Sequence, residues 1–216
     1  NAMPNLIKKH PDLVYLIIGE THPNVKRNEG EKYRNFLENK VRELGLQKYV
    51  KFHDKYLSLD EIIRYLKATD IYVSSGMNPN QITSGTLVYA MGCGRAIVST
   101  PFLHAKDCIT EDNGRLVDFS DSKSYEESID MILRDSDKKK EMELNSYRKS
   151  RNMTWPNVAL AYKKLFNDIL NFPEISTLPL ISVDHLYRLT DSFGIIQFAN
   201  QHMPDVGSGY SLDDNK

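Results

Sequence analysis

The 216-residue sequence lacks three features that would each indicate a particular class of protein. It has no apolar run near the ~20 residues that a membrane-spanning helix needs, because its longest candidate, residues 13–18, is only as long as a strand. Its two cysteines, Cys93 and Cys108, cannot form a disulfide framework and favour a reducing compartment. It has no excess of positive charge, because 28 Lys and Arg residues face 29 Asp and Glu residues. We therefore predict a cytoplasmic protein with no membrane span and no nucleic-acid partner.

Composition divides the chain near residue 172. The last 44 residues carry six acidic and two basic side chains, whereas the rest of the chain has a slight excess of bases. We predict a principal domain over residues 4–172, followed over residues 173–216 by a linker and the start of another domain. Residues 4–10 read as the end of a helix already under way, so we expect the first strand of the principal domain to be missing. A sheet that lacks its first strand has an open edge, which could pair with a second copy in a homodimer.

Strand and helix patterns alternate along the principal domain. Residues 13–18 are apolar without interruption, which is typical of a strand buried on both faces of a parallel sheet. Residues 30–44 repeat apolar side chains at helical spacing, and residues 58–61 form a capping-box sequence at the start of another helix. Further strands are predicted at residues 50–52, 71–73, 96–99 and 114–117. This alternation predicts an α/β fold, a Rossmann-like parallel sheet with helices on both faces.

Ligands of such sheets bind where the strands end at their carboxyl termini. The most informative loop there runs from residue 74 to a helix that begins with Thr83, Ser84, Gly85 and Thr86. Exposed amide donors and the positive end of the helix dipole favour anions at such a position, so these four residues could bind a diphosphate. The alternative is that Thr83 or Ser84 simply caps its own helix.

The loops after the first two strands offer weaker candidates. Gly19 would allow a ligand to approach the backbone closely, and the alternative is that it serves only a tight exit from the strand. His22 follows three residues later and could touch a substrate, although a lone loop histidine is usually solvated. The histidines are scattered without the spacing of metal ligands, and we expect no metal and no cofactor.

Several short segments of this sequence match the pattern of a known family. They are residues 16–20, 43–46, 68–73, 90–100, 113–117 and 153–155. Together they resemble the C-terminal, donor-binding domain of GT-B glycosyltransferases, the group 1 (family 4) retaining type, across residues 12–170. The stretch from Asn78 to Ala90 resembles a branch of that family in which a second, helical carbohydrate-related domain follows, and residues 185–191 and 209–215 resemble its start.

The resemblance implies a function and a set of site residues. It implies transfer of a sugar from a nucleoside diphosphate to a glycan acceptor with retained configuration, by a longer protein whose N-terminal GT-B domain is missing here. The isolated fragment is then expected to be inactive. Gln81 would be the catalytic residue that contacts the transferred sugar, and Tyr89 would face the ribose. Lys55 and Tyr56, together with Gly19, would line the nucleotide pocket.

Two departures from the family pattern keep other functions open. The family usually has two glutamates where this sequence has Gln81 and Tyr89. A tyrosine has a single hydroxyl and cannot accept from the ribose bidentately, with two oxygens, as a carboxylate does. A degenerate, non-catalytic GT-B module with an interaction role is one alternative. A nucleotide-sugar epimerase is another, although it would need acid and base carboxylates that Gln81 does not supply.

Overall fold

The computed structural model describes residues 1–170, 184, 188, 199–200 and 203–204. The chain forms two compact units, Asn1–Tyr162 and Lys163–Lys216. In the second unit, β6 (Ala199–Asn200) and β7 (Met203–Pro204) pair antiparallel. The boundary predicted at residue 172 stays a prediction, and the segments at 185–187 and 209–215 that suggested a following domain lie outside the described residues.

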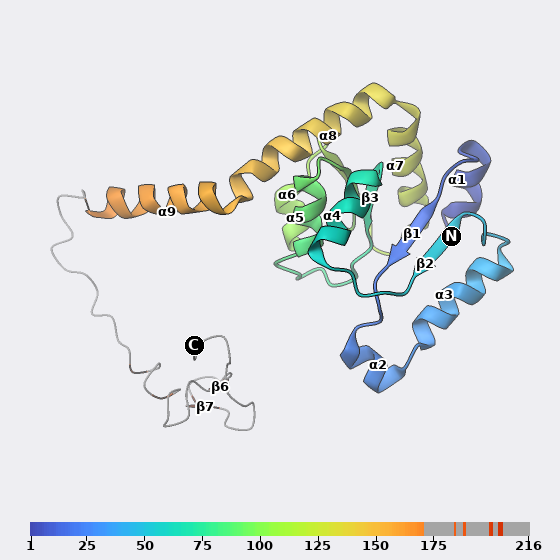
Figure 1. Ribbon diagram of the computed structural model, residues 1–216, viewed down its shortest axis with the longest axis horizontal. Coiled ribbons are helices and arrows are strands. Elements are labelled where there is room, and N and C mark those ends of the chain that lie inside the picture. The colour runs from blue at the N-terminus through green and yellow to red at the C-terminus, as the bar shows by residue number, and fades with distance from the viewer. Residues whose placement is uncertain (171–183, 185–187, 189–198, 201–202, 205–216) are drawn as a thin grey trace. The chain divides into compact units, whose positions relative to one another are not determined.

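Strands and helices alternate through the first unit (Figure 1). The strands are β1 (Tyr15–Ile18), β2 (Val50–His53), β3 (Ile71–Ser74), β4 (Ala96–Ser99) and β5 (Gly114–Leu116). The helices are α1 (Met3–Lys9), α2 (Pro23–Glu29), α3 (Lys32–Glu43), α4 (Leu59–Ala68), α5 (Gly85–Gly92), α6 (Leu103–Cys108), α7 (Ser122–Arg134) and α8 (Ser136–Ser150). A 3₁₀ turn, η1 (Arg151–Met153), leads into α9 (Trp155–Leu170), which continues past the end of the unit.

All the strands of the first unit pair in parallel, which confirms the predicted fold class. β1 pairs with β2, and β3 pairs with β4, which pairs with β5. The capping box predicted at the start of α4 is also present, because the Ser58 and Glu61 side chains each accept a hydrogen bond from the other's backbone N–H. α4 carries the chain from the carboxyl end of β2 to the amino end of β3, so β1 and β3 run in the same direction.

The core forms on both faces of β4, which is fully buried. Ile97 packs on one face with side chains of α5 and α6. Ala96 and Val98 pack on the other face with Ile132 of α7 and Met142 of α8. This alternation places helices on both faces of the sheet, as the sequence predicted.

β1 and β3 differ from β4 because both are only half-buried. Leu16 in the middle of β1 keeps 43% of its surface exposed, although residues 13–18 were predicted to be buried on both faces. That prediction was wrong in degree for a physical reason: in the described part of the chain β1 has a strand neighbour only on the β2 side, and β3 only on the β4 side.

Candidate functional site

The carboxyl ends of β1 and β2 are joined through Gly19 and Arg34. The Gly19 N–H donates to the His53 carbonyl, and the Gly19 carbonyl accepts from Arg34 Nη2 at 2.7 Å. The same Nη2 atom lies 3.1 Å from Asp54 Oδ1. Gly19 has a φ of +121°, a conformation that glycine adopts without strain. The tight strand exit that we considered for Gly19 is therefore present, and Arg34 holds it.

Sequence reasoning missed Arg34, which lies on α3 without any motif around it. Its side chain is largely buried, and its Nη1 atom is buried without a hydrogen-bond partner among the described residues. Only the folded geometry shows that this guanidinium reaches the strand ends.

Lys55 and Tyr56 follow β2, as predicted, but their contacts differ. Lys55 Nζ lies 2.7 Å from Glu61 Oε1, at the amino end of α4. This hydrogen bond is the largest cause of both a raised pKa for Lys55 and a lowered pKa for Glu61, which falls to about 2. The Tyr56 backbone N–H donates to the Glu20 carboxylate at 3.2 Å, whereas the residue as a whole is 80% exposed. Lys55 is thus engaged with α4, and the Tyr56 ring is available to a ligand.

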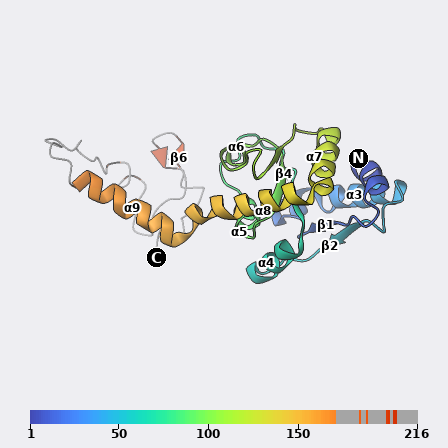
Figure 2. The ribbon, with the colours of Figure 1, turned by 90° about the horizontal axis from the view of Figure 1, so that it is seen from above.

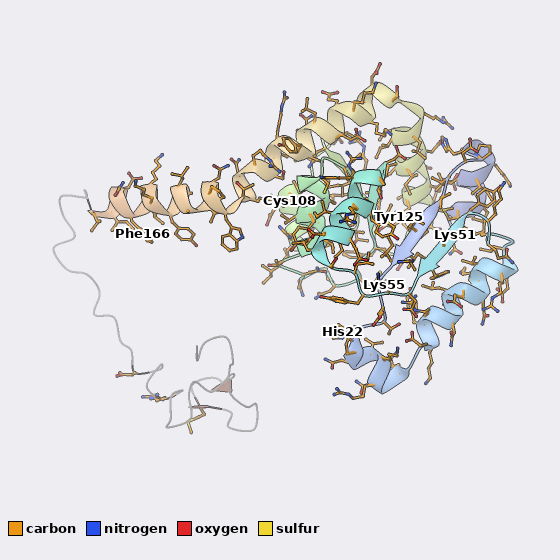
Figure 3. The ribbon with its side chains drawn as sticks, in the orientation of Figure 1. His22, Lys51, Lys55, Cys108, Tyr125 and Phe166 are labelled. Carbon is orange, nitrogen blue, oxygen red and sulfur yellow. The ribbon has the colours of Figure 1, made fainter. Side chains whose placement is uncertain are left out.

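His22 lies at the start of α2 and caps it. Its Nδ1 atom accepts from the Asn24 N–H at 3.3 Å. Figure 3 shows His22 and Lys55 on the same side of the unit, where β1 and β2 end. The structure thus gives His22 a local role as a helix cap.

The beginning of α5 is held by Ser84 and His104. Ser84 is the N-cap, and its buried side chain accepts from the Leu87 N–H at 3.4 Å. The Ser84 N–H donates in turn to His104 Nδ1 of α6 at 2.8 Å. The capping alternative is therefore realised for Ser84, and neither its amide nor its hydroxyl oxygen is left entirely to a ligand.

The backbone amides of Gly85 and Thr86 are the donors at the start of α5 that a ligand could use. The amides of the first helical turn have no intrahelical carbonyl partner, and those of Gly85 and Thr86 have no acceptor within the described residues. Both residues are exposed, and a Cβ atom at Gly85 would meet nothing within 4 Å. The Thr86 hydroxyl oxygen accepts from the Tyr72 hydroxyl at 2.8 Å. The start of α5 thus presents two amides to open space.

Gln81 and Tyr89 lie on either side of these amides in the sequence. Gln81 Nε2 donates to the Thr83 carbonyl at 3.0 Å, and the Gln81 carbonyl accepts from the His104 N–H at 3.2 Å. Gln81 therefore shapes the loop before α5 and keeps its side-chain oxygen as an acceptor. Tyr89, one turn into α5, is 38% exposed.

The structure arranges the predicted site residues in two groups. Gly19, Lys55 and Tyr56 form one group at the ends of β1 and β2, and residues 81–89 form the other at the end of β3 and the start of α5. No hydrogen bond or ion pair found in the described part of the chain joins the two groups. Within the described part of the chain, no three His, Cys, Asp or Glu side chains lie together so that they could hold a metal ion. No helix in that part is both long and apolar enough to cross a membrane.

Comparisons with known proteins agree on one family. Residues 1–149 match the family model described as glycosyl transferases group 1. A curated relative, the uncharacterized glycosyltransferase MJ1069 of Methanocaldococcus jannaschii, is 25% identical over an alignment of 182 residues, and the match covers 79% of this chain and 43% of the relative. The chain thus spans less than half the length of that relative.

Solved structures show the same fold. The C-terminal domain of the glycosyl transferase group 1 family protein LpcC from Francisella tularensis is similar with a TM-score of 0.61 and 26% identity, over 70% of this chain and 74% of that one. Sucrose-phosphate synthase from Thermosynechococcus elongatus gives a TM-score of 0.62 at 20% identity, over 78% of this chain and 41% of that one. Anabaena HepE in complex with UDP and glucose gives 0.62 at 17% identity, over 79% of this chain and 44% of that one.

Proposed function

This chain belongs to the glycosyl transferases group 1 family, and from that premise we propose that it binds the nucleotide-sugar donor of a glycosyltransferase. The whole protein would transfer the sugar to a glycan acceptor with retained configuration. The family match supports the reaction class, and HepE, a protein of similar fold, has been solved with UDP and with UDP-glucose. The 216-residue chain would supply donor binding rather than complete catalysis.

One observation carries the proposal: the exposed amides of Gly85 and Thr86 at the start of α5. Two unpaired N–H groups and the positive end of the helix dipole form a favourable site for a diphosphate. The open space around Gly85 lets phosphate oxygens approach the backbone. As the bond between the sugar's anomeric carbon and the diphosphate oxygen breaks, negative charge develops on the departing diphosphate, and these amides would stabilise it without a metal or cofactor.

Gln81, Tyr56 and Tyr89 would contact other parts of the donor. The Gln81 side-chain oxygen is left as an acceptor for a sugar hydroxyl, because the amide nitrogen already holds the Thr83 carbonyl. The exposed Tyr56 ring offers a flat apolar surface for a base, and the Tyr89 hydroxyl would face the ribose. Lys55 would contribute only by exchanging its bond to Glu61 for one to the ligand.

Calorimetric titration with UDP, ADP and GDP tests the donor site. We expect heat with at least one of them at millimolar concentration. Gly85→Glu, which places a carboxylate beside the proposed diphosphate, should weaken that binding by at least about tenfold, or about 1.4 kcal/mol. Gln47→Glu is the matched control, because it adds the same charge on an exposed residue that precedes β2, at the opposite edge of the sheet. Equal affinities for the two variants, or no heat with any nucleotide, would contradict the proposed site.

Binding and transfer need separate tests, since Gln81 and Tyr89 replace the two glutamates of the family that the sequence resembles. The whole protein should release nucleoside diphosphate from a nucleotide sugar in the presence of acceptor glycans. Tight binding without any release would instead favour the non-catalytic module.

A further inference from the structure

The loop that precedes α5 is tied to the segment that connects β4 to α6. The Thr100 N–H donates to the Ser74 carbonyl at 3.2 Å, and the Thr100 hydroxyl donates to the Gly76 carbonyl at 2.6 Å. Further along the loop, the Leu103 N–H donates to the Pro79 carbonyl at 3.1 Å. The loop is therefore held along its length by a segment that lies about twenty residues later in the sequence.

His104 makes two more contacts with this loop, close to the start of α5. Its backbone N–H donates to the Gln81 carbonyl at 3.2 Å. Its ring atom Nδ1 accepts from the Ser84 N–H at 2.8 Å. One residue of α6 thus fixes both Gln81, the proposed sugar contact, and the amide that directly precedes those of Gly85 and Thr86.

The ring contact of His104 sets the direction of the first turn of α5. Nδ1 can accept a hydrogen bond only when it carries no proton, so the proton of the neutral ring is on Nε2. Ser84 is buried, and its N–H would lose this acceptor if Nδ1 were removed. Because the amides of residues 84–86 follow one another at the beginning of the helix, a shift of the first would redirect the other two.

The core of the unit fixes His104 itself. In the sequence it lies between Phe102 and Ala105, which are both buried. These two side chains belong to the cluster that also contains Leu87 and Met91 of α5. Figures 1 and 2 show α5 and α6 on the side of the unit away from β1 and β2. The imidazole is thus carried by a helix that packs against α5, as the support of a preorganised ligand site requires.

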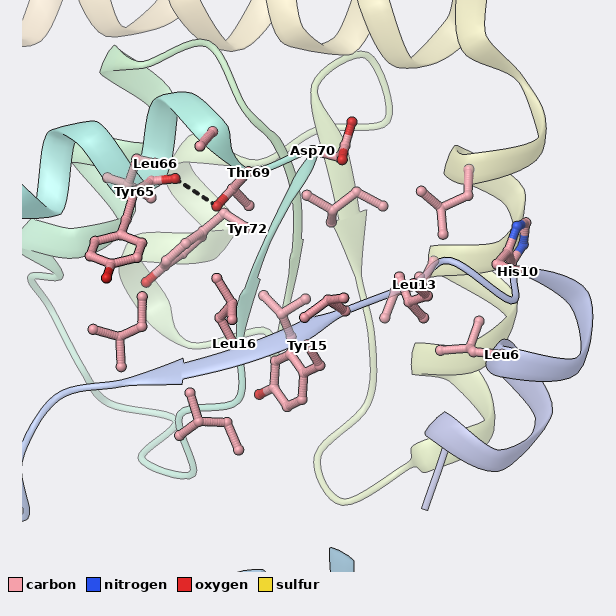
Figure 4. Close-up of a pocket in the computed structure, with 18 of the residues that line it drawn as sticks. Leu6, His10, Leu13, Tyr15, Leu16, Tyr65, Leu66, Thr69, Asp70 and Tyr72 are labelled. Carbon is pink, nitrogen blue, oxygen red and sulfur yellow. Dashed lines mark hydrogen bonds between the residues drawn. The ribbon is translucent and has the colours of Figure 1, made fainter. Parts of the chain in front are cut away.

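A second side chain reaches the start of α5 from β3. The Tyr72 hydroxyl donates to the Thr86 hydroxyl oxygen at 2.8 Å. Figure 4 shows Tyr72 among the side chains that line a cavity beside β3. This contact holds a side chain, whereas His104 holds the backbone. Of the two contacts, that of His104 therefore fixes the path of the chain that carries the free amides.

We propose that His104 is a positioning residue for the donor diphosphate. It would hold Gln81 and Ser84 so that the amides of Gly85 and Thr86 face the ligand before it arrives. Binding would then need no rearrangement of the loop, and less of the attraction between amides and phosphate oxygens would be lost to ordering the site. This inference rests on the proposed donor site and adds to it a residue that acts through its neighbours.

Two substitutions separate the acceptor atom from the rest of the ring. The probe is whichever of UDP, ADP and GDP binds the unaltered chain. His104→Ala removes Nδ1 and should weaken nucleotide binding by at least about tenfold in calorimetric titration. His104→Asn places Oδ1 near the position of Nδ1, where it can accept from the Ser84 N–H. It should restore the affinity to within about threefold of the unaltered chain.

A matched control and a second readout separate positioning from stability. Asp135 caps α8 by accepting from the Lys138 N–H at 2.9 Å, so Asp135→Ala also removes a side-chain acceptor at the start of a helix. It should lower the melting temperature and leave the nucleotide affinity unchanged. Hydrogen exchange followed by NMR should show the Ser84 amide at least about tenfold less protected in His104→Ala than in His104→Asn, with the amides of β4 protected in both.

The possible results lead to different conclusions. No heat with the unaltered chain would overturn the donor site itself, and this inference with it. Nucleotide binding that is as tight in His104→Ala as in the unaltered chain would overturn the positioning role alone. An equal loss in His104→Ala and His104→Asn would also overturn it, because the Nδ1 acceptor would then not be what matters. A similar loss in Asp135→Ala would attribute the effect to general stability.

Discussion

Substitution of Gly114 by alanine tests the packing at the centre of the sheet. A Cβ atom at Gly114 would lie 2.5 Å from the Ile97 carbonyl oxygen and 3.0 Å from Ile109 Cγ2. The first distance is about 0.9 Å short of the 3.4 Å at which ordinary contacts begin. Relief requires movement of the β4 backbone, which is fully buried and paired on both sides. Overpacking typically costs about 1–3 kcal/mol, and we expect about 2–3 kcal/mol here, because the atom in the way belongs to the backbone.

Urea unfolding followed by circular dichroism measures this loss in the free energy of unfolding. In a thermal melt, the melting temperature should fall by about 5–10 °C. Gly92→Ala is the control, because a Cβ atom there would meet only the end of the Arg151 side chain, at 3.9 Å. Alanine is a better helix former than glycine, so this control should be neutral or slightly stabilising. A Gly114→Ala protein as stable as the control would refute the close packing of β4 against β5.

Three further changes test contacts that hold the unit together. Asp130→Asn removes the carboxylate that Lys9, His10 and Arg134 contact at 2.7–3.1 Å, and it should cost about 2 kcal/mol in urea unfolding. Asp137→Asn, on the exposed face of α8, should cost nothing measurable. Tyr125→Phe loses a 2.7 Å hydrogen bond to a β3 carbonyl, about 1 kcal/mol. Because burial raises the pKa of Tyr125 from 10 to about 12, the wild-type advantage should persist below pH 10 and disappear as the pH rises to about 12. The pKa of Glu61 is lowered from 4.5 to about 2, mainly by its hydrogen bond from Lys55, so its contribution to stability should be complete above pH 4.5 and vanish as the pH falls to about 2. Glu61→Gln should remove that part of the acid dependence of the urea midpoint, and an unchanged acid profile would disprove the assignment.

The strands were predictable because their apolar runs are short, uninterrupted and bounded by turn residues. β4 is the best example, since the strand predicted at residues 96–99 has those bounds in the structure. α2 was missed because Pro23 and Asn24 suggest a turn, although proline also suits the first helical position. α6 was missed because six residues without a side-chain cap give no periodic signal. The capping box at Ser58 was found because its two partners lie three residues apart.

The site was less predictable because its key contacts join distant parts of the chain. Ser84 is recognisable as a helix cap from its neighbours, but the acceptor of its amide is His104, twenty residues later. His104 gave no signal of its own and was counted among the scattered histidines. Arg34 likewise reaches Gly19 and Asp54 only through the packing of α3 beside β1 and β2. Local patterns could therefore indicate which helix begins at the site, but not which of its amides remain free.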